Sequence, residues 1–345
     1  MSYNELRKDY LLNRWVVIAT ERARRPTDFT KKKTEPANTS ICPLCPGNEY
    51  MTPPATLVYY EEDNEIHKTR EQGEYRSKNW LIRSIPNMYP AFAPPNGLAN
   101  VAQMKKSSSF GYAVGHHEVL VESPNHNEQP PDAPLGQLVH LINAFKDRLS
   151  QIAREPYVQY VQILRNYGLE AGASLSHPHS QIIATPFVPA ILEGEQAASK
   201  SYYSENCSCV FCDLIKQETS SPRHIMDNGL FAVFAPYASV NPMEFWILPK
   251  RHAANILDLD GVETEAFAQT LKIMLKALKD VVNDPPYNFG IHLALDDDKK
   301  NYYHWHLEVY PHLAIWAGFE KSTGVFINTI TPETAATELR KAIDK

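Results

Sequence analysis

One arrangement of cysteines and histidines occurs twice along this 345-residue chain. Each half contains a Cys-x-x-Cys pair, then a single histidine, then a His-x-His pair. The two Cys pairs are 167 positions apart, whereas the histidines recur after 126 or 127 positions. This repeat predicts a duplicated domain with extra residues between the Cys pair and the single histidine in the first half. The residues are Cys42, Cys45, His126, His177 and His179, and then Cys209, Cys212, His252, His304 and His306.

Each repeat supplies a set of zinc ligands. Two cysteines separated by two residues, together with two histidines, satisfy the tetrahedral coordination that Zn²⁺ prefers. Four protein ligands leave no open position for water, so we predict two structural zinc ions per chain. The ligand sets are Cys42, Cys45, His126 and His177 in the first half, and Cys209, Cys212, His252 and His304 in the second. Cys207 is interpreted as an ordinary thiol. No role is assigned to His67, His116, His117, His140, His224, His292 or His312.

Composition excludes several classes of protein. With 43% hydrophobic and 21% charged residues, the chain can bury a large core. The net charge of −6 argues against a nucleic-acid partner, and no apolar run is long enough to span a membrane. The first residues lack the charged and apolar regions of a secretory signal, so we expect a cytoplasmic protein. In that compartment cysteines are mostly thiols or metal ligands.

The hydrophobic pattern predicts an α+β fold with a mostly antiparallel sheet flanked by helices. We interpret residues 31–40 and 193–206 as surface connections and residues 94–109 as a loop. Predicted strands cover 14–18, 56–60, 117–121, 157–164, 231–235, 245–249, 289–295 and 305–310. Predicted helices cover about 134–154 and 263–282, and a last one begins near Pro332.

The segment from Asn166 to Ala184 contains the candidate nucleophile. Pro178 favours an extended backbone, which lets one histidine hold metal while its neighbour stays free. A histidine held in its neutral form by a carbonyl on one nitrogen can attack phosphorus with the other, and His179 is our candidate. Asn166, Ser174 and Gln181 offer neutral hydrogen-bond donors nearby. The alternatives are that His179 is a third metal ligand or a packed strand residue.

The sequence GASLSHPHSQIIATP, residues 172–186, resembles the active-site strand of the galactose-1-phosphate uridylyltransferase family, in the histidine-triad superfamily. The resemblance extends over essentially the whole chain. It implies tandem histidine-triad domains at residues 1–195, with the nucleophile and first zinc site, and 196–345, with the second zinc site. It also implies a homodimer.

The same resemblance implies roles for individual residues. His177 corresponds to the zinc-ligating histidine, His179 to the nucleophile and Gln181 to a contact of the nucleotidyl phosphate. His304-Trp305-His306 resembles the degenerate partner of the active-site strand. Further substrate contacts implied by the resemblance are Arg22 and Arg25 for phosphate, Asn87 and Tyr89 for the nucleoside, Asn166, Gly172 and Ser174 near the phosphate, and Glu320, Thr323 and Gly324 for the sugar phosphate.

The resemblance implies a ping-pong reaction in which His179 takes UMP from UDP-glucose and passes it to galactose 1-phosphate or another hexose 1-phosphate. Val325-Phe326 stand where galactose enzymes tend to have Tyr-Glu, which leaves the hexose contact open. One alternative is therefore a nucleotide-sugar phosphorylase or adenylyltransferase that uses ADP-glucose and phosphate on the same scaffold. Two others are a hydrolase and a zinc-ribbon interaction module.

Overall fold

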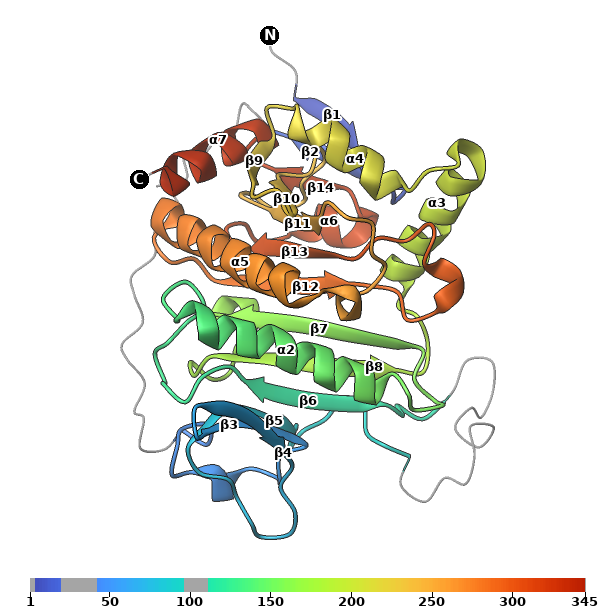
Figure 1. The fold of residues 1–345 in the computed structure, drawn as a ribbon. Coiled ribbons are helices and arrows are strands. Elements are labelled where there is room, and N and C mark those ends of the chain that lie inside the picture. The colour runs from blue at the N-terminus through green and yellow to red at the C-terminus, as the bar shows by residue number, and fades with distance from the viewer. Residues whose placement is uncertain (1–3, 20–41, 96–110, 345) are drawn as a thin grey trace. The chain divides into compact units, whose positions relative to one another are not determined.

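The computed structural model describes residues 4–19, 42–95 and 111–344. Its contacts divide the chain into two compact units. Unit 1 comprises residues 1–35, 166–174 and 190–345, and unit 2 comprises residues 36–165 and 175–189. Each unit combines helices with antiparallel strands, so the predicted α+β class is confirmed (Figure 1).

Unit 2 contains antiparallel strands in the order β4-β3-β5-β6-β8-β7. The long helix α2 (Leu135–Ile152) packs against β3 and β5, and its buried face includes Leu138, Phe145 and Leu149, which recur at helical spacing. The strands are β3 (Leu57–Glu62), β4 (Glu65–Thr69), β5 (Trp80–Pro86), β6 (His116–Val121), β7 (Tyr160–Tyr167) and β8 (His179–Thr185), and the last two residues of β7 belong to unit 1.

Unit 1 contains a larger and a smaller sheet. The larger one is antiparallel in the order β12-β13-β11-β10-β9, and the smaller one has the order β1-β2-β14 with β14 parallel to β2. The strands are β1 (Glu5–Lys8), β2 (Trp15–Ile18), β9 (His224–Asp227), β10 (Phe231–Phe234), β11 (Phe245–Pro249), β12 (Tyr287–His292), β13 (His306–Pro311) and β14 (Phe326–Asn328).

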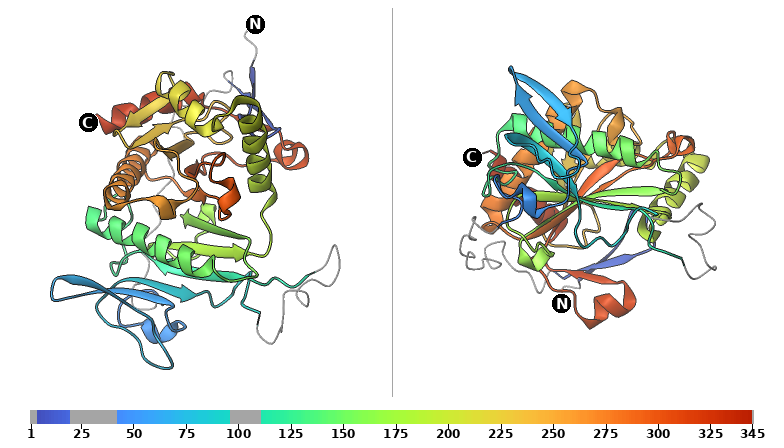
Figure 2. Two further views of the ribbon diagram at one scale, coloured as in Figure 1. Left: turned by 45° about the vertical axis from the view of Figure 1, so that its right-hand side comes forward. Right: turned by 90° about the horizontal axis from the view of Figure 1, so that it is seen from below.

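Among the residues that the structure describes, unit 1 has the helices α3 (Ala190–Asn206), α4 (Val210–Thr219), α5 (Gly261–Val282), α6 (Gly318–Thr323) and α7 (Pro332–Ile343) (Figure 2). Helix α5 begins with a capping box, in which the side chains of Asp260 and Glu263 each accept a hydrogen bond from the other's backbone N–H. Its buried face includes Phe267, Leu271 and Leu278, and the helix packs on α7.

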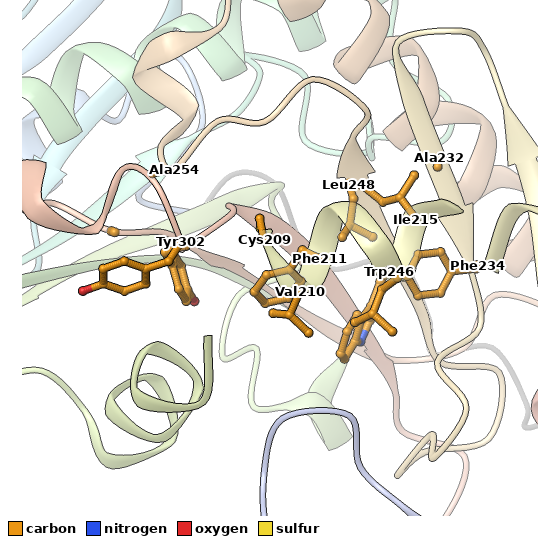
Figure 3. Close-up of a cluster of buried hydrophobic side chains, with 13 residues drawn as sticks. Cys209, Val210, Phe211, Ile215, Ala232, Phe234, Trp246, Leu248, Ala254 and Tyr302 are labelled. Carbon is orange, nitrogen blue, oxygen red and sulfur yellow. The ribbon is translucent and has the colours of Figure 1, made fainter. Parts of the chain in front are cut away.

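A buried cluster joins α4 to β10 and β11 in unit 1 (Figure 3). Phe211 on α4, Phe234 on β10 and Trp246 on β11 are at most 2% exposed. Cys209, which precedes α4, belongs to the same cluster. The second Cys pair is therefore attached directly to the hydrophobic core.

The interpretation of residues 193–206 as a surface connection is wrong, because they form most of α3. The buried positions of this helix are Leu192, Glu195, Gln196 and Ser199, which recur at helical spacing. Three of the four are polar, so the hydrophobic pattern does not predict a helix here. Within the described ranges, no helix is both long enough and apolar enough to cross a membrane.

Candidate active site and metal centres

The first set of predicted metal ligands forms one cluster in unit 2. The Nδ1 atom of His177 lies 3.8 Å from the Sγ atom of Cys42 and 3.5 Å from that of Cys45. The Nδ1 atom of His126 lies 3.2 Å from the Sγ atom of Cys45. All four residues are buried, and their candidate ligand atoms lie within 4.8 Å of one another. The cluster can therefore hold a metal ion.

The second set forms a matching cluster in unit 1. The Sγ atom of Cys212 lies 3.4 Å from the Nδ1 atom of His252 and 3.5 Å from that of His304. Cys209, Cys212, His252 and His304 again place their candidate ligand atoms within 4.8 Å of one another. The predicted ligand sets are thus brought together in both halves of the sequence.

The histidines of both clusters present Nδ1 to the cysteines and use Nε2 for a hydrogen bond elsewhere. The Nε2–H groups of His177, His252 and His304 donate to the carbonyl oxygens of Ser123, Lys300 and Pro249, at 2.8, 2.6 and 2.9 Å. Such bonds fix the tautomer whose Nδ1 lone pair is free to bind a metal. Burial lowers the pKa of His177 to about 4, which favours the same neutral form.

A third group of potential ligands was not found by sequence reasoning. Glu195, His292, His306 and Glu308, all buried in unit 1, place their donor atoms within 4.8 Å of one another. The Nδ1 atom of His292 lies 3.1 Å from the Oε2 atom of Glu195, and the Nε2 atom of His306 lies 3.2 Å from the Oε1 atom of Glu308. Burial alone would lower the pKa of His292, but the charges of Glu195 and Glu308 outweigh it and raise the pKa to about 9. Glu195 therefore belongs to this group and not to the second Cys₂His₂ cluster.

His179 is the first residue of β8 and is 6% exposed. Its Nδ1–H donates to the carbonyl oxygen of His177 at 2.8 Å. In the part of the chain that the structure describes, no hydrogen bond engages its Nε2 atom. Burial lowers the pKa of His179, and the guanidinium of Arg165 acts in the same direction. The ring therefore has the neutral form and hydrogen bond expected from the sequence, with the Nε2 lone pair available.

A buried polar network surrounds the segment that carries His177 and His179. The guanidinium of Arg165 contacts Glu122 at 2.9 Å, and Ser180 donates to the same carboxylate at 2.6 Å. Arg165 also donates to Gln129, whose amide donates to the carbonyl oxygen of Ser176 at 3.0 Å. The network thus fixes the residues immediately before and after the two histidines.

Gln181 and Asn87 meet at a histidine that sequence reasoning left without a role. The Nε2 atom of His117 on β6 lies 2.8 Å from the Oε1 atom of Gln181 and 3.1 Å from the Nδ2 atom of Asn87. The backbone N–H of Tyr89 donates to the Oδ1 atom of Asn87 at 2.8 Å, and the Tyr89 side chain is 86% exposed. In the sequence, His117 alternates with Val119 and Val121 along a predicted strand. This pattern predicts a strand but does not indicate a contact with Gln181.

The other predicted substrate contacts are in unit 1 or outside the described residues. Asn166 accepts a hydrogen bond from Asn288 at 2.7 Å. Gly172 adopts a left-handed backbone with φ 87°, and Ser174 is exposed. Glu320 caps α6 at the N–H of Ala317, Thr323 donates to a carbonyl of the same helix, and Gly324 ends it with φ 69°. Arg22 and Arg25 lie outside the described residues.

Comparison with known proteins identifies the class to which this fold and these histidines belong, that of nucleotidyltransferases. The family model described as galactose-1-phosphate uridyl transferase, N-terminal domain, matches residues 67–189, and that of the C-terminal domain matches residues 195–343. The chain therefore belongs to the galactose-1-phosphate uridylyltransferase family.

Relatives with two different activities cover nearly the whole chain. An ADP-glucose phosphorylase from Arabidopsis thaliana is 35% identical, covering 98% of this chain and 92% of the relative. A galactose-1-phosphate uridylyltransferase from Thermotoga maritima is 29% identical, covering 98% of each.

Solved structures give the same two groups of relatives. The crystal structure of an ADP-glucose phosphorylase from Arabidopsis thaliana with bound ADP-glucose superimposes with a TM-score of 0.80 at 32% identity, covering 98% of this chain and 99% of that one. A uridylyltransferase structure superimposes with a TM-score of 0.74 at 28% identity, covering 99% and 98%.

Proposed function

We propose that the chain transfers a nucleoside monophosphate from a nucleotide sugar to a phosphate acceptor through a covalent intermediate on His179. One observation carries this proposal: the Nδ1–H of His179 donates to the carbonyl oxygen of His177, and Nε2 has no partner among the described residues. A neutral imidazole held in this way is a nucleophile suited to phosphorus. His177, two residues earlier, points its own Nδ1 toward the cysteines, so metal binding does not compete for His179.

The proposed reaction needs no separate general acid or general base. The Nε2 lone pair of His179 attacks the α-phosphorus, the bond to the bridging oxygen breaks, and the sugar 1-phosphate leaves with that electron pair. The Nδ1–H stays on the ring and keeps its hydrogen bond to His177 as the ring becomes positively charged. An oxygen of the acceptor then attacks the same phosphorus, and the P–N bond breaks to regenerate the neutral ring. Gln181 is the proposed donor to the phosphoryl oxygens.

We propose ADP-glucose and inorganic phosphate as the preferred substrates, giving ADP and glucose 1-phosphate. The 35% identical Arabidopsis relative and the neighbouring structure with bound ADP-glucose support this choice. The residues that follow Gly324 also support the choice of ADP-glucose and phosphate. Phe326 packs on Val16, Ile18 and Trp316. Val325-Phe326 thus lack the polar Tyr-Glu pair that galactose enzymes tend to have at this place, which favours an acceptor other than galactose 1-phosphate.

Transfer of UMP from UDP-glucose to galactose 1-phosphate is the second candidate. It is supported by the Thermotoga maritima relative, which is similar over 98% of both chains. A homodimer is proposed for either activity on the family resemblance.

We propose zinc for the two Cys₂His₂ clusters. With Zn–S bonds of about 2.3 Å and Zn–N bonds of about 2.0–2.1 Å, a tetrahedral ion separates sulfur and nitrogen by about 3.6 Å. The sulfur–nitrogen separations of 3.2–3.8 Å in the first cluster and 3.4–3.5 Å in the second fit that ion. Four protein ligands fill the coordination sphere, so zinc would stabilise the fold and take no part in the reaction.

Trapping the covalent intermediate tests the proposal. The protein is incubated with ADP-glucose or UDP-glucose without acceptor, quenched in base, and analysed by intact mass and peptide mapping. We expect an adenylyl group on the peptide that contains His179, its discharge by phosphate as ADP, and no label in His179→Asn. His67→Asn, which changes a histidine of β4, is the matched control. A label on another residue, or none with either nucleotide sugar, would refute the covalent mechanism. Uridylyl labelling with discharge by galactose 1-phosphate alone would select the second candidate.

A further inference from the structure

We propose that His117 is a positioning residue that orients the side-chain amide of Gln181 toward the phosphoryl group carried by His179. This inference rests on the proposed function and deepens it. His117 makes contacts on both sides of its ring, and together these contacts determine which end of the Gln181 amide faces it.

The first contact fixes the tautomer of His117. Its Nδ1 atom lies 3.1 Å from the backbone N of Ala91, whose N–H donates to it. A nitrogen that accepts a hydrogen bond carries no proton, so the hydrogen of the neutral ring is on Nε2. A proton on the Nδ1 atom of His117 would place its N–H group against the backbone N–H of Ala91.

The second contact then fixes the amide of Gln181. Because the Nε2 atom of His117 carries hydrogen, the atom 2.8 Å away must be the amide oxygen of Gln181. The Nδ2 atom of Asn87 lies 3.1 Å from the same nitrogen but also carries hydrogens, so it cannot accept. The NH₂ group of Gln181 is consequently turned away from His117.

The strand register places the reacting histidine on the same face. His179 and Gln181 are two residues apart on β8, and alternate residues of a strand share one face. Val119 is opposite Gln181 and Val121 is opposite His179, so His117 is on this face too. With its oxygen held by His117, Gln181 has only N–H groups left to offer on the face that carries His179. Those donors suit the negative oxygens of a nucleotidyl phosphate.

His117 also connects Gln181 to the segment proposed to hold the nucleoside. The backbone N–H of Asn87 donates to the carbonyl oxygen of His117 at 2.8 Å, and Ala91 donates to its ring. The segment from Asn87 to Ala91 is therefore attached to His117 at two points. The hydrogen bond that we propose between Gln181 and the phosphoryl group should therefore depend on the two hydrogen bonds that join His117 to this segment.

A double-mutant cycle tests the inference. Single-turnover transfer from ADP-glucose to His179 is measured in the wild type, His117→Phe, Gln181→Ala and the double variant. We expect His117→Phe to slow transfer about 10- to 100-fold in the wild-type background, since loss of one oriented donor costs about 10²–10³-fold. In the Gln181→Ala background the same change should cost less than about twofold, because residues that act as a unit are not additive. An equal cost in both backgrounds would overturn the inference.

Two further variants separate positioning from packing. His117→Gln keeps a donor near the position of Nε2 and should recover most of the rate lost in His117→Phe. His116→Phe, the same change one residue earlier on the opposite face of β6, should transfer at the wild-type rate. A His117→Gln variant as slow as His117→Phe, or an equally slow His116→Phe, would contradict a role for the Nε2–H group.

A measurement independent of activity distinguishes this inference from the proposed function. Long-range ¹⁵N–¹H spectra of the wild type, assigned with His117→Gln, should show the Nε2–H tautomer of His117, and its Nε2 resonance should shift in Gln181→Ala. The Nδ1–H tautomer would overturn the inference even if nucleotidyl transfer occurs as proposed. Wild-type transfer by Gln181→Ala would instead refute the role that the proposed function gives to Gln181.

Discussion

Arg165 and Glu122 form an ion pair at 2.9 Å with side chains that are 1% and 3% exposed. Ser180, the neighbour of His179, donates to the same carboxylate, and the backbone N–H of Glu122 donates to the carbonyl oxygen of Pro178. The pair therefore fixes the chain on both sides of the proposed nucleophile. Removing one of its charges should affect both stability and transfer.

We expect Arg165→Met to lower the free energy of unfolding by about 3–5 kcal/mol, because it leaves the Glu122 carboxylate buried without its partner. Arg154→Met, which changes an exposed arginine, should have little effect. Denaturant unfolding of the two variants checks this expectation. Equal stability of the two would show that the buried pair does not hold the segment in place.

His179→Asn should reduce nucleotidyl transfer about 10⁴-fold or more, as removal of a nucleophile does elsewhere. Its metal content should remain that of the wild type, because His177 and not His179 faces the cysteines. Steady-state assays and elemental analysis of the purified protein check both statements. Loss of metal together with activity would mean that His179 is a ligand.

Cys42→Ala should release one equivalent of metal per chain and lower the melting temperature, because a closed site contributes its binding free energy to folding. Cys207→Ala is the matched control, since Cys207 is exposed and outside both clusters. Calorimetry and metal analysis measure the two effects. Wild-type metal content and melting temperature in Cys42→Ala would exclude a structural metal there.

Glu244 should make unit 1 less stable as pH rises. This carboxyl is 1% exposed, and burial, assisted by the charge of Glu308, raises its pKa to about 7 from 4.5. Between pH 4.5 and pH 7 the folded chain holds a proton that the unfolded chain has released. The stability that this proton contributes is therefore complete below pH 4.5 and is lost as the pH rises through 7. The size of the effect is at most about 3 kcal/mol.

Glu244→Gln should therefore gain stability relative to the wild type as pH increases from 5 to 8. Melting temperatures of both proteins across this range measure the difference. The exposed Glu265→Gln should follow the wild type at every pH. A constant difference between Glu244→Gln and the wild type would show that Glu244 is already ionised at pH 5.

The features that could be predicted from the sequence depend on local spacing. The cysteine and histidine intervals predicted two ligand sets that the structure brings together, and the helical pattern predicted α2 and α5. The expectation that a backbone carbonyl holds one nitrogen of His179 also agrees with the structure, but the sequence did not indicate that this carbonyl belongs to His177.

The features that were missed depend on contacts between distant segments. His117 meets Gln181 only because β6 pairs with β8, and His292 meets His306 only because β12 pairs with β13. Helix α3 was missed because its buried side chains, such as Glu195 and Gln196, are polar. The burial of Glu195 is stabilised by Tyr303 and His292, which lie about 100 positions away in sequence.

His306 has the same position in the second repeat as His179 in the first, but both of its nitrogens are engaged. Its Nδ1 atom contacts the carbonyl oxygen of His304 at 3.1 Å, its Nε2 atom contacts Glu308 at 3.2 Å, and the ring is 0% exposed. Under the proposed mechanism, the polypeptide therefore offers a single point of covalent attachment, at His179. Titration with nucleotide sugar should saturate at one equivalent per polypeptide, and any kinetic cooperativity would have to arise between chains and not between the repeats of one chain.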